Sequence, residues 1–236
     1  QDTISENTCL HLGHAYLRLQ DIENAKLSYA AAIRYNINPI VREEAMYNYV
    51  QVSYLQNSAL GESIIAFQDF IRDYPNSKYI NKVYALMADL YMTSKNYRAA
   101  LTALETISNA DKKILDTKQY LRYQLAVDAF VQGKMTEVIE WSNKVITNAK
   151  QPSTYKTEAY YLAAQAHYRL HQYPECITHL DAYQQQPNIA ASTNQNTAIY
   201  LKAYALFNQK DYTAAESVFR SYVQVIADKD NTTYPD

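Results

Sequence analysis

The sequence predicts an all-α fold in which about six helix hairpins stack in a row as an α-solenoid. Three observations predict it. A turn motif recurs at a step of about 38 residues through the 236-residue chain. The segments on both sides of each turn carry apolar residues at intervals of three and four, which is the period of an amphipathic helix. With only 3 Gly, the chain has too few of these residues for the tight turns of a sheet fold.

The turn motif consists of polar residues, then an apolar residue, and then a small or compact apolar residue three positions later. Five copies are 20–25, 95–100, 133–138, 171–176 and 210–215, and a weaker sixth copy is 58–63. Because each copy joins two helical patterns, the motif predicts six hairpins. Their ranges are 6–39, 44–77, 81–112, 119–151, 157–188 and 196–228, so one solenoid domain occupies residues 1–236.

We expect small residues at the positions where two helices touch, and the sequence has them in successive hairpins. In the first helices these are Gly13, Ala88, Ala126, Ala164 and Ala203, and in the second helices Ala25, Ala100, Cys176 and Ala215. Large side chains such as Tyr29, Phe67 and Phe219 fill the remaining space in the first, second and sixth hairpins. The third and fourth hairpins match least well, because Leu104 and Ser142 stand at the aromatic position.

Proline marks the joints between hairpins, because it cannot continue a helix. The prolines that follow second helices are Pro39, Pro75, Pro152 and Pro187. Pro174 instead opens a second helix, where its missing N–H costs nothing.

The first hairpin carries a family resemblance. Its Leu12-Gly13 pair is followed by Tyr16, and its second helix has Ala25, Tyr29 and Ala32. This pattern resembles the tetratricopeptide repeat (TPR), although the usual period of that repeat is about 34 residues. The resemblance implies a right-handed α-solenoid of TPR-like hairpins whose concave groove binds a peptide or a segment of a partner protein, without catalysis.

A narrower resemblance concerns the succession of segments 42–49, 74–79 and 96–101. It is similar to the long TPR proteins of the Bacteroidetes cell envelope. The resemblance implies an exported protein, either periplasmic or associated with the outer membrane. We further expect the 236 residues to be a fragment of a longer chain whose signal peptide lies outside this sequence.

Charge and composition exclude several classes of protein. The chain has 22 Lys and Arg against 24 Asp and Glu, a net charge of −2, so it lacks the basic surface that nucleic acid requires. No apolar run reaches the roughly 18 residues of a transmembrane helix. Its 2 Cys cannot form a disulfide framework.

The sequence predicts neither catalysis nor a cofactor. No G-x-S-x-G elbow occurs, and Cys9 and Cys176 stand at packing positions as free thiols. Two histidine groups have metal-ligand spacing, namely His11 with His14, and His167 with His171 and His179. Surface or packing roles are favoured for them, so no metal site is predicted.

The candidate binding residues form a stripe on the first helices, at three positions spaced four and then three apart. Aromatic residues occupy seven of the nine such positions in the last three hairpins and none in the first three. These seven are Tyr123, Phe130, Tyr161, Tyr168, Tyr200, Tyr204 and Phe207, and Arg169 follows the stripe by one residue. The TPR resemblance places the stripe in the groove, where aromatic and Arg side chains would anchor a partner. The alternative is that the rings pack against neighbouring first helices.

Three functions remain open. The preferred one is a non-catalytic scaffold that binds protein or peptide. The second is a glycan-binding module of the cell envelope, since tyrosine rings also stack on sugars. The third is a regulatory or sensor arm of a longer protein.

Overall fold

The all-α prediction is confirmed. The structure, a computed structural model, describes residues 3–56, 60–149 and 153–233. Within these ranges it contains twelve α-helices, one short 3-10 helix and no strand. Ser58 and Ala59, assigned above to a turn, and Pro152, assigned to a joint, lie outside the described residues.

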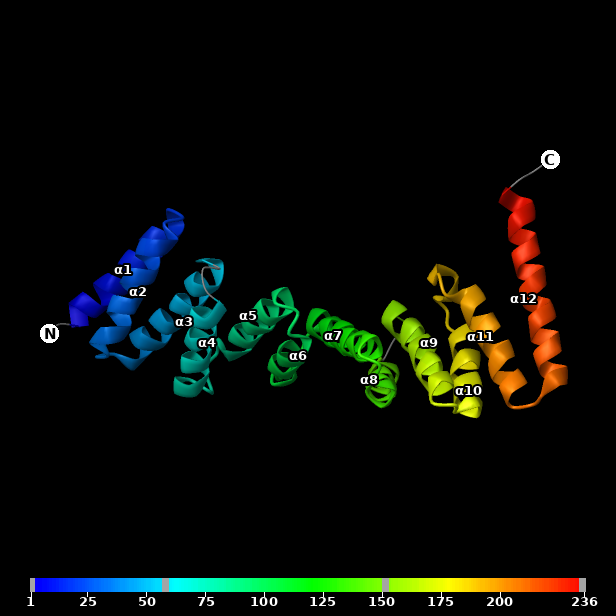
Figure 1. The fold of residues 1–236 in the computed structure, drawn as a ribbon. Helices are drawn as coiled ribbons and strands as arrows, with labels where there is room; N and C mark the ends of the chain where they lie inside the picture. Colours follow the sequence, from blue (N-terminus) through cyan, green and yellow to red (C-terminus); the bar gives the residue numbers. More distant parts are fainter. Residues whose placement is uncertain (1–2, 57–59, 150–152, 234–236) are drawn as a thin grey trace. The chain divides into compact units, whose positions relative to one another are not determined.

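The chain divides into two compact units, Gln1–Ile114 and Leu115–Asp236. Figure 1 labels the helices of both units. The helices of the first unit are α1 (Thr3–Arg18), α2 (Ile22–Tyr35), α3 (Pro39–Gln56), α4 (Leu60–Asp73), α5 (Ile80–Thr93) and α6 (Tyr97–Glu105). Those of the second are α7 (Lys112–Val131, which begins at the boundary), α8 (Met135–Asn148), α9 (Thr154–Arg169), α10 (Tyr173–Gln184), η1 (Ile189–Ala191), α11 (Gln195–Asn208) and α12 (Tyr212–Thr233).

Each unit is built of hairpins that pack in sequence order. In the first unit every helix contacts the next one, and the first helices α1, α3 and α5 also contact each other in order. In the second unit the helices from α8 to α12 pack in the same way, with α9 against α11. This is the packing of an α-solenoid, in which a hairpin buries its faces on its neighbours. That all six hairpins form one continuous domain stays a prediction.

The hairpin turns share one backbone geometry. A residue in the left-handed region stands at the same place in five turns: Gln20 (φ 60°), Lys95 (57°), Gly133 (76°), His171 (59°) and Lys210 (69°). In the first turn the Gln20 N–H donates to the Leu17 carbonyl (3.0 Å) and the Asp21 N–H to the Tyr16 carbonyl (2.9 Å), and the same pair of bonds recurs in the other four turns. These bonds form a Schellman motif, which satisfies the last carbonyls of the first helix.

The next helix begins directly after this turn. Asp21, Asn96 and Asp211 accept a hydrogen bond from the backbone N–H three residues further on, at 3.1, 3.2 and 3.1 Å. Such N-caps satisfy donors that the first helical turn leaves open. A helix stop and a helix start are therefore joined within a few residues, which fixes the antiparallel hairpin.

Prolines occupy the joints as predicted, with one refinement. Pro75 and Pro187 follow α4 and α10, and Pro174 lies in the first turn of α10. Pro39 follows α2 but is also the first residue of α3, a position where its fixed φ suits the helix.

A buried carboxylate that the sequence analysis did not single out fastens the first hairpin. Glu6 of α1 is fully buried, and its two oxygens accept the backbone N–H groups of Ile37 and Asn38 at 3.0 Å each. Glu158 of α9 similarly accepts a hydrogen bond from the Asn194 side chain (2.8 Å). In both cases the first helix of a hairpin holds the loop that leads to the next first helix, so successive hairpins keep their spacing.

Candidate interaction surface

The helical spacing of aromatic residues on α11 and α12 produces one joint surface. Tyr200, Tyr204 and Phe207 recur along α11 at intervals of four and three, and Tyr212, Phe219 and Tyr222 lie on α12. Residues at such intervals share one helix face. We call these six residues the terminal aromatic surface.

The rings of the terminal aromatic surface contact each other across the two helices. The centroids of Tyr204 and Phe219 lie 5.2 Å apart at 86°, and those of Tyr200 and Tyr222 lie 5.2 Å apart. Phe207 and Tyr212 pair at 5.3 Å across the turn. Edge-to-face and tilted contacts at these distances are favourable, so the rings hold one another in place before any partner arrives.

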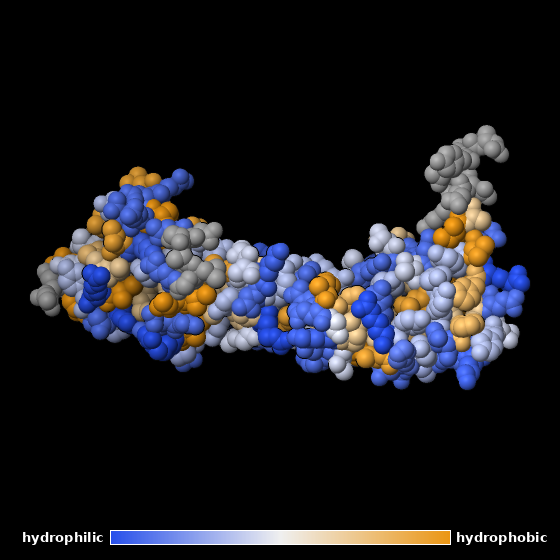
Figure 2. All heavy atoms as spheres, in the orientation of Figure 1, coloured by the Kyte–Doolittle hydropathy of each residue, from blue (hydrophilic) through white to orange (hydrophobic). Residues whose placement is uncertain are grey.

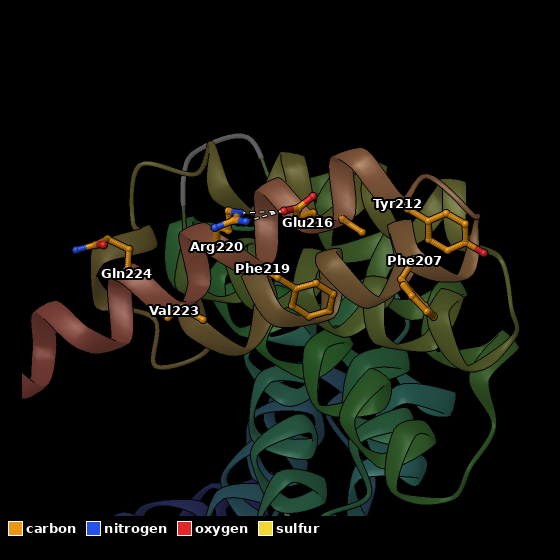
Figure 3. Close-up of a pocket in the computed structure, with 8 residues that line it drawn as sticks. Phe207, Tyr212, Glu216, Phe219, Arg220, Val223 and Gln224 are labelled. Carbon is orange, nitrogen blue, oxygen red and sulfur yellow. Dashed lines mark hydrogen bonds and ion pairs between the residues drawn. The ribbon is translucent and has the colours of Figure 1, made fainter.

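Much of this surface is open to solvent. Tyr200, Tyr204, Phe207 and Tyr212 are 40%, 38%, 51% and 57% exposed. Figure 3 shows the adjoining hollow, which has a volume of about 730 Å³ and includes Phe207, Tyr212, Phe219 and Val223 in its lining. In Figure 2 hydrophobic residues run along α12 beside hydrophilic ones. Exposed aromatic rings around a hollow are typical of protein interaction surfaces.

Polar groups border the hollow. Arg220 donates two hydrogen bonds to one carboxylate oxygen of Glu216, at 2.7 and 3.1 Å, along the exposed side of α12 (Figure 3). The Tyr200 hydroxyl donates to that of Tyr204 at 3.2 Å, and this hydrogen bond raises the pKa of Tyr200. The terminal aromatic surface therefore combines apolar rings with polar groups at its rim that can accept or donate hydrogen bonds.

The predicted stripe does not form a single exposed row. Tyr161 is only 6% exposed; its ring lies 5.6 Å from that of Tyr183, and its hydroxyl accepts a hydrogen bond from Gln165 (3.0 Å). Burial raises the pKa of Tyr161. This ring belongs to the core between hairpins, which is the alternative that the sequence left open for the stripe.

The remaining predicted residues lie in three separate pairs. The Arg169 guanidinium stands 4.2 Å from the Phe130 ring centroid, so α9 and α7 bring these two together. Tyr168 is half-buried, with its ring 5.7 Å from that of Tyr173. Tyr123 is half-buried beside Tyr155, at 5.7 Å between centroids, and burial raises its pKa.

Sequence reasoning missed the α12 side of the surface. Tyr212, Arg220 and Val223 were not selected, and Phe219 was assigned to packing alone. The usable signal was the repeat itself, because Tyr212 and Phe219 stand at the same repeat positions as Tyr173 and Leu180. In the fifth hairpin these positions pack against α11, whereas no helix of the described residues other than α11 lies against them on α12.

The His, Cys, Asp and Glu side chains that could bind a metal ion or take part in catalysis are dispersed in the part of the chain that the structure describes. There, no group of three or more His, Cys, Asp and Glu has the geometry to hold a metal ion. His167 and His179 approach to 4.8 Å between ring centroids, whereas His171 lies in the turn and contacts Tyr173. Cys9 and Cys176 are free, and burial raises the pKa of the Cys176 thiol to about 12, which keeps it protonated and unreactive.

None of the helices in the described ranges has the length and apolar character that a membrane span requires.

Comparison with known proteins identifies the repeat. The family model described as tetratricopeptide repeat matches residues 6–36 and 197–228. No curated protein has a significantly similar sequence.

Several solved structures are similar to this chain. A TPR repeats protein from Bacteroides fragilis is 15% identical, with a TM-score of 0.55, over 93% of this chain and 98% of that one. A tetratricopeptide repeat protein from Parabacteroides merdae is 13% identical, with a TM-score of 0.48, over 93% and 79%. The TPR2AB domain of yeast Sti1, solved in a complex with pHSP90, is 14% identical, with a TM-score of 0.42, over 97% and 93%. The chain therefore carries tetratricopeptide repeats in its first and last hairpins and has the α-solenoid fold of a tetratricopeptide repeat protein.

Proposed function

We propose that this protein is a non-catalytic scaffold that binds a segment of a partner protein on the terminal aromatic surface. The observation that carries the proposal is the set of exposed rings of Tyr200, Tyr204, Phe207 and Tyr212 beside a hollow of about 730 Å³. TPR folds are commonly protein interaction scaffolds and are generally non-catalytic.

The energetics favour this surface over the rest of the stripe. Aromatic side chains dominate binding energy when a partner desolvates them, at about 2 kcal/mol or more for each anchor. Phe207 and Tyr212 are each more than half exposed, so both gain apolar burial on binding. Tyr161 is already buried and has little surface left to offer. The rings contact each other before binding, so little side-chain entropy is lost.

The experiment is a selection of displayed random peptides against the whole 236-residue chain, followed by affinity measurements on the enriched sequences. The test variant is Phe207→Ala with Tyr212→Ala, and the matched control is Tyr35→Ala, which removes an aromatic side chain of α2 that is 38% exposed. We expect at least about a tenfold loss of affinity in the test variant and none in the control. The absence of any enriched peptide, or equal loss in both variants, would contradict the proposal.

The same variants test the glycan alternative. An oligosaccharide array probed with the intact chain and with the Phe207→Ala, Tyr212→Ala variant distinguishes it from the scaffold proposal. Glycan signals that disappear in the variant, without enriched peptides, would favour a glycan-binding module.

We also propose a cell-envelope location, which rests on the resemblance of the sequence to Bacteroidetes envelope proteins. Fractionation of cells that express the full-length gene tests it, and recovery in the cytoplasm would contradict it.

A further inference from the structure

We propose that His167 of α9 and His179 of α10 together bind a divalent transition metal ion of the kind that imidazole prefers, such as Zn²⁺. The sequence groups these two residues with His171 by their spacing, and the structure brings the two of them together without His171. The site has two protein ligands, fewer than the groups of three or more considered above. It is independent of the proposed function, because it lies outside the terminal aromatic surface.

The two imidazole rings lie at the separation that a shared metal ion requires. Their centroids are 4.8 Å apart, and their planes are inclined by 35°. A metal ion about 2.0–2.1 Å from one nitrogen of each ring, with about 90–110° between the two bonds, places the centroids roughly 4.5–5.2 Å apart. The rings therefore need little movement to share an ion.

The hydrogen bonds of the two rings leave the same nitrogen available in each. Nδ1 of His167 lies 2.7 Å from Oε1 of Gln172, and Nδ1 of His179 lies 2.9 Å from the backbone carbonyl of Glu175. Because these oxygens only accept, each Nδ1 carries the hydrogen and each Nε2 carries a lone pair. Metal-bound histidines usually donate their other N–H to an oxygen in this way, which fixes the tautomer and the ring orientation.

The two Nε2 atoms also face the same way. Gln172 directly precedes α10 and Glu175 lies in the first turn of this helix, so both Nδ1 atoms are held toward the turn between α9 and α10. Nε2 lies on the far side of each ring, so both Nε2 atoms face away from that turn. On α9, Tyr160 stands two helical turns further along in this direction, with its ring 6.2 Å from that of His179.

The surroundings suit a metal ion that enters from solvent. His167 is 8% exposed and His179 is half-buried, so the pair lies at the edge of the hairpin core. An ion bound there would join the two helices and would keep its remaining coordination positions for water, as in zinc sites that have an open position.

Packing of the hairpin does not require histidine at these two places. When the hairpins are aligned on their turns, Leu206 and Val218 occupy the corresponding positions in the sixth hairpin, and Tyr91 and Ala103 occupy them in the third. These apolar pairs fill the same space between the first and second helices. A metal site accounts for the paired imidazoles of the fifth hairpin, which packing alone leaves unexplained.

Titration of the whole 236-residue chain with ZnCl₂, NiCl₂ and MgCl₂, followed by calorimetry, tests the inference. We expect Zn²⁺ and Ni²⁺ to bind, whereas Mg²⁺, which prefers oxygen ligands, should not. NMR spectra of the imidazole nitrogens locate the ion. Zn²⁺ should shift the Nε2 resonances of His167 and His179, and both Nδ1 atoms should keep their hydrogens.

Variants of the hairpin identify the ligands. His167→Gln and His179→Gln should each weaken Zn²⁺ binding at least about tenfold. His171→Gln is the matched control, because it removes a histidine of the same hairpin whose ring contacts Tyr173 instead, and it should leave the affinity unchanged. Gln172→Glu should tighten binding, because a carboxylate acceptor makes the His167 ring a more basic ligand, and Gln172→Leu should weaken it.

Two outcomes would overturn the inference. One is equal Zn²⁺ affinity in the native chain and in both ligand variants, and the other is a set of Nε2 shifts confined to His11, His14 and His171. If a ligand variant fails to fold, the NMR titration of the native chain and the opposite effects of the two Gln172 variants decide the question.

Discussion

A β-carbon at Gly13 would lie 2.5 Å from Cε1 of Tyr29. The backbone of α1 and the ring of α2 thus occupy the full distance between the helices, and Tyr29 is fully buried. The contact between Gly13 and Tyr29 therefore sets the distance between α1 and α2.

Gly13→Ala should therefore destabilise the protein, although alanine is the better helix former by about 1 kcal/mol. The buried ring cannot move without disturbing its neighbours, and overpacking costs about 1–3 kcal/mol. We expect a lower urea midpoint. Tyr29→Leu should relieve the clash, so the two substitutions together should cost less than their sum. An unchanged midpoint for Gly13→Ala alone would contradict the close contact.

Tyr29→Phe should be neutral or should stabilise the protein by about 1 kcal/mol. The Tyr29 hydroxyl is buried and has no hydrogen-bond partner among the described residues, and an unpaired buried polar group is costly. Tyr183 is the matched control, because it is equally buried but its hydroxyl shares a 2.5 Å hydrogen bond with Ser192. Tyr183→Phe should cost about 1 kcal/mol. Equal effects in thermal or urea unfolding would refute this distinction.

Lys95→Gly should stabilise the protein by about 0.5–1 kcal/mol. Lys95 stands at φ 57° in the turn before α6, a conformation that costs a residue with a side chain about 1–2 kcal/mol. Glycine avoids this cost but loses more entropy on folding, so the net gain is smaller. Lys82→Gly within α5 is the control and should destabilise by about 1 kcal/mol. A fall in melting temperature for Lys95→Gly would count against the left-handed turn.

Acidification should weaken the α9–α10 hairpin through His179. Burial lowers the pKa of His179 below 6.5, and the nearby His167 lowers it further. The hydrogen bond to the Glu175 backbone and the Glu175 carboxylate both raise the pKa, but they do not outweigh the burial. Tyr160 of α9 also faces the ring. Since the folded pKa lies below the unfolded one, the stability that depends on His179 is complete above about pH 6.5 and is lost as pH falls through the folded pKa.

His179→Gln should accordingly reduce the loss of unfolding free energy between pH 7.5 and pH 5. His171→Gln is the control, because His171 lies in the exposed turn and contacts Tyr173 instead. Urea unfolding at the two pH values measures the effect. The same pH dependence in native protein and His179→Gln would rule out this titration.

Local signals were sufficient to predict the helices and their pairing. The polar turn followed by Ala25 or Ala100 recurs at a nearly fixed step, and both alanines are fully buried in the structure. Pro174 stands in the first turn of α10, as expected. These features depend on interactions within a few residues of the chain, namely turn geometry, capping and helix period, which the sequence shows directly.

The exposure of each aromatic ring was decided only by the tertiary structure. Tyr161 and Tyr200 occupy the same repeat position with the same side chain. Tyr161 packs against α11 and is 6% exposed, whereas Tyr200, which lies on α11 itself, is 40% exposed. Glu6 similarly resembled any solvated carboxylate until folding brought Ile37 and Asn38 to its oxygens. The sequence by itself determined which positions recur and can pack. Only the folded chain determined which of them have a neighbour, because burial depends on residues about 40 positions away in sequence rather than on the residue itself.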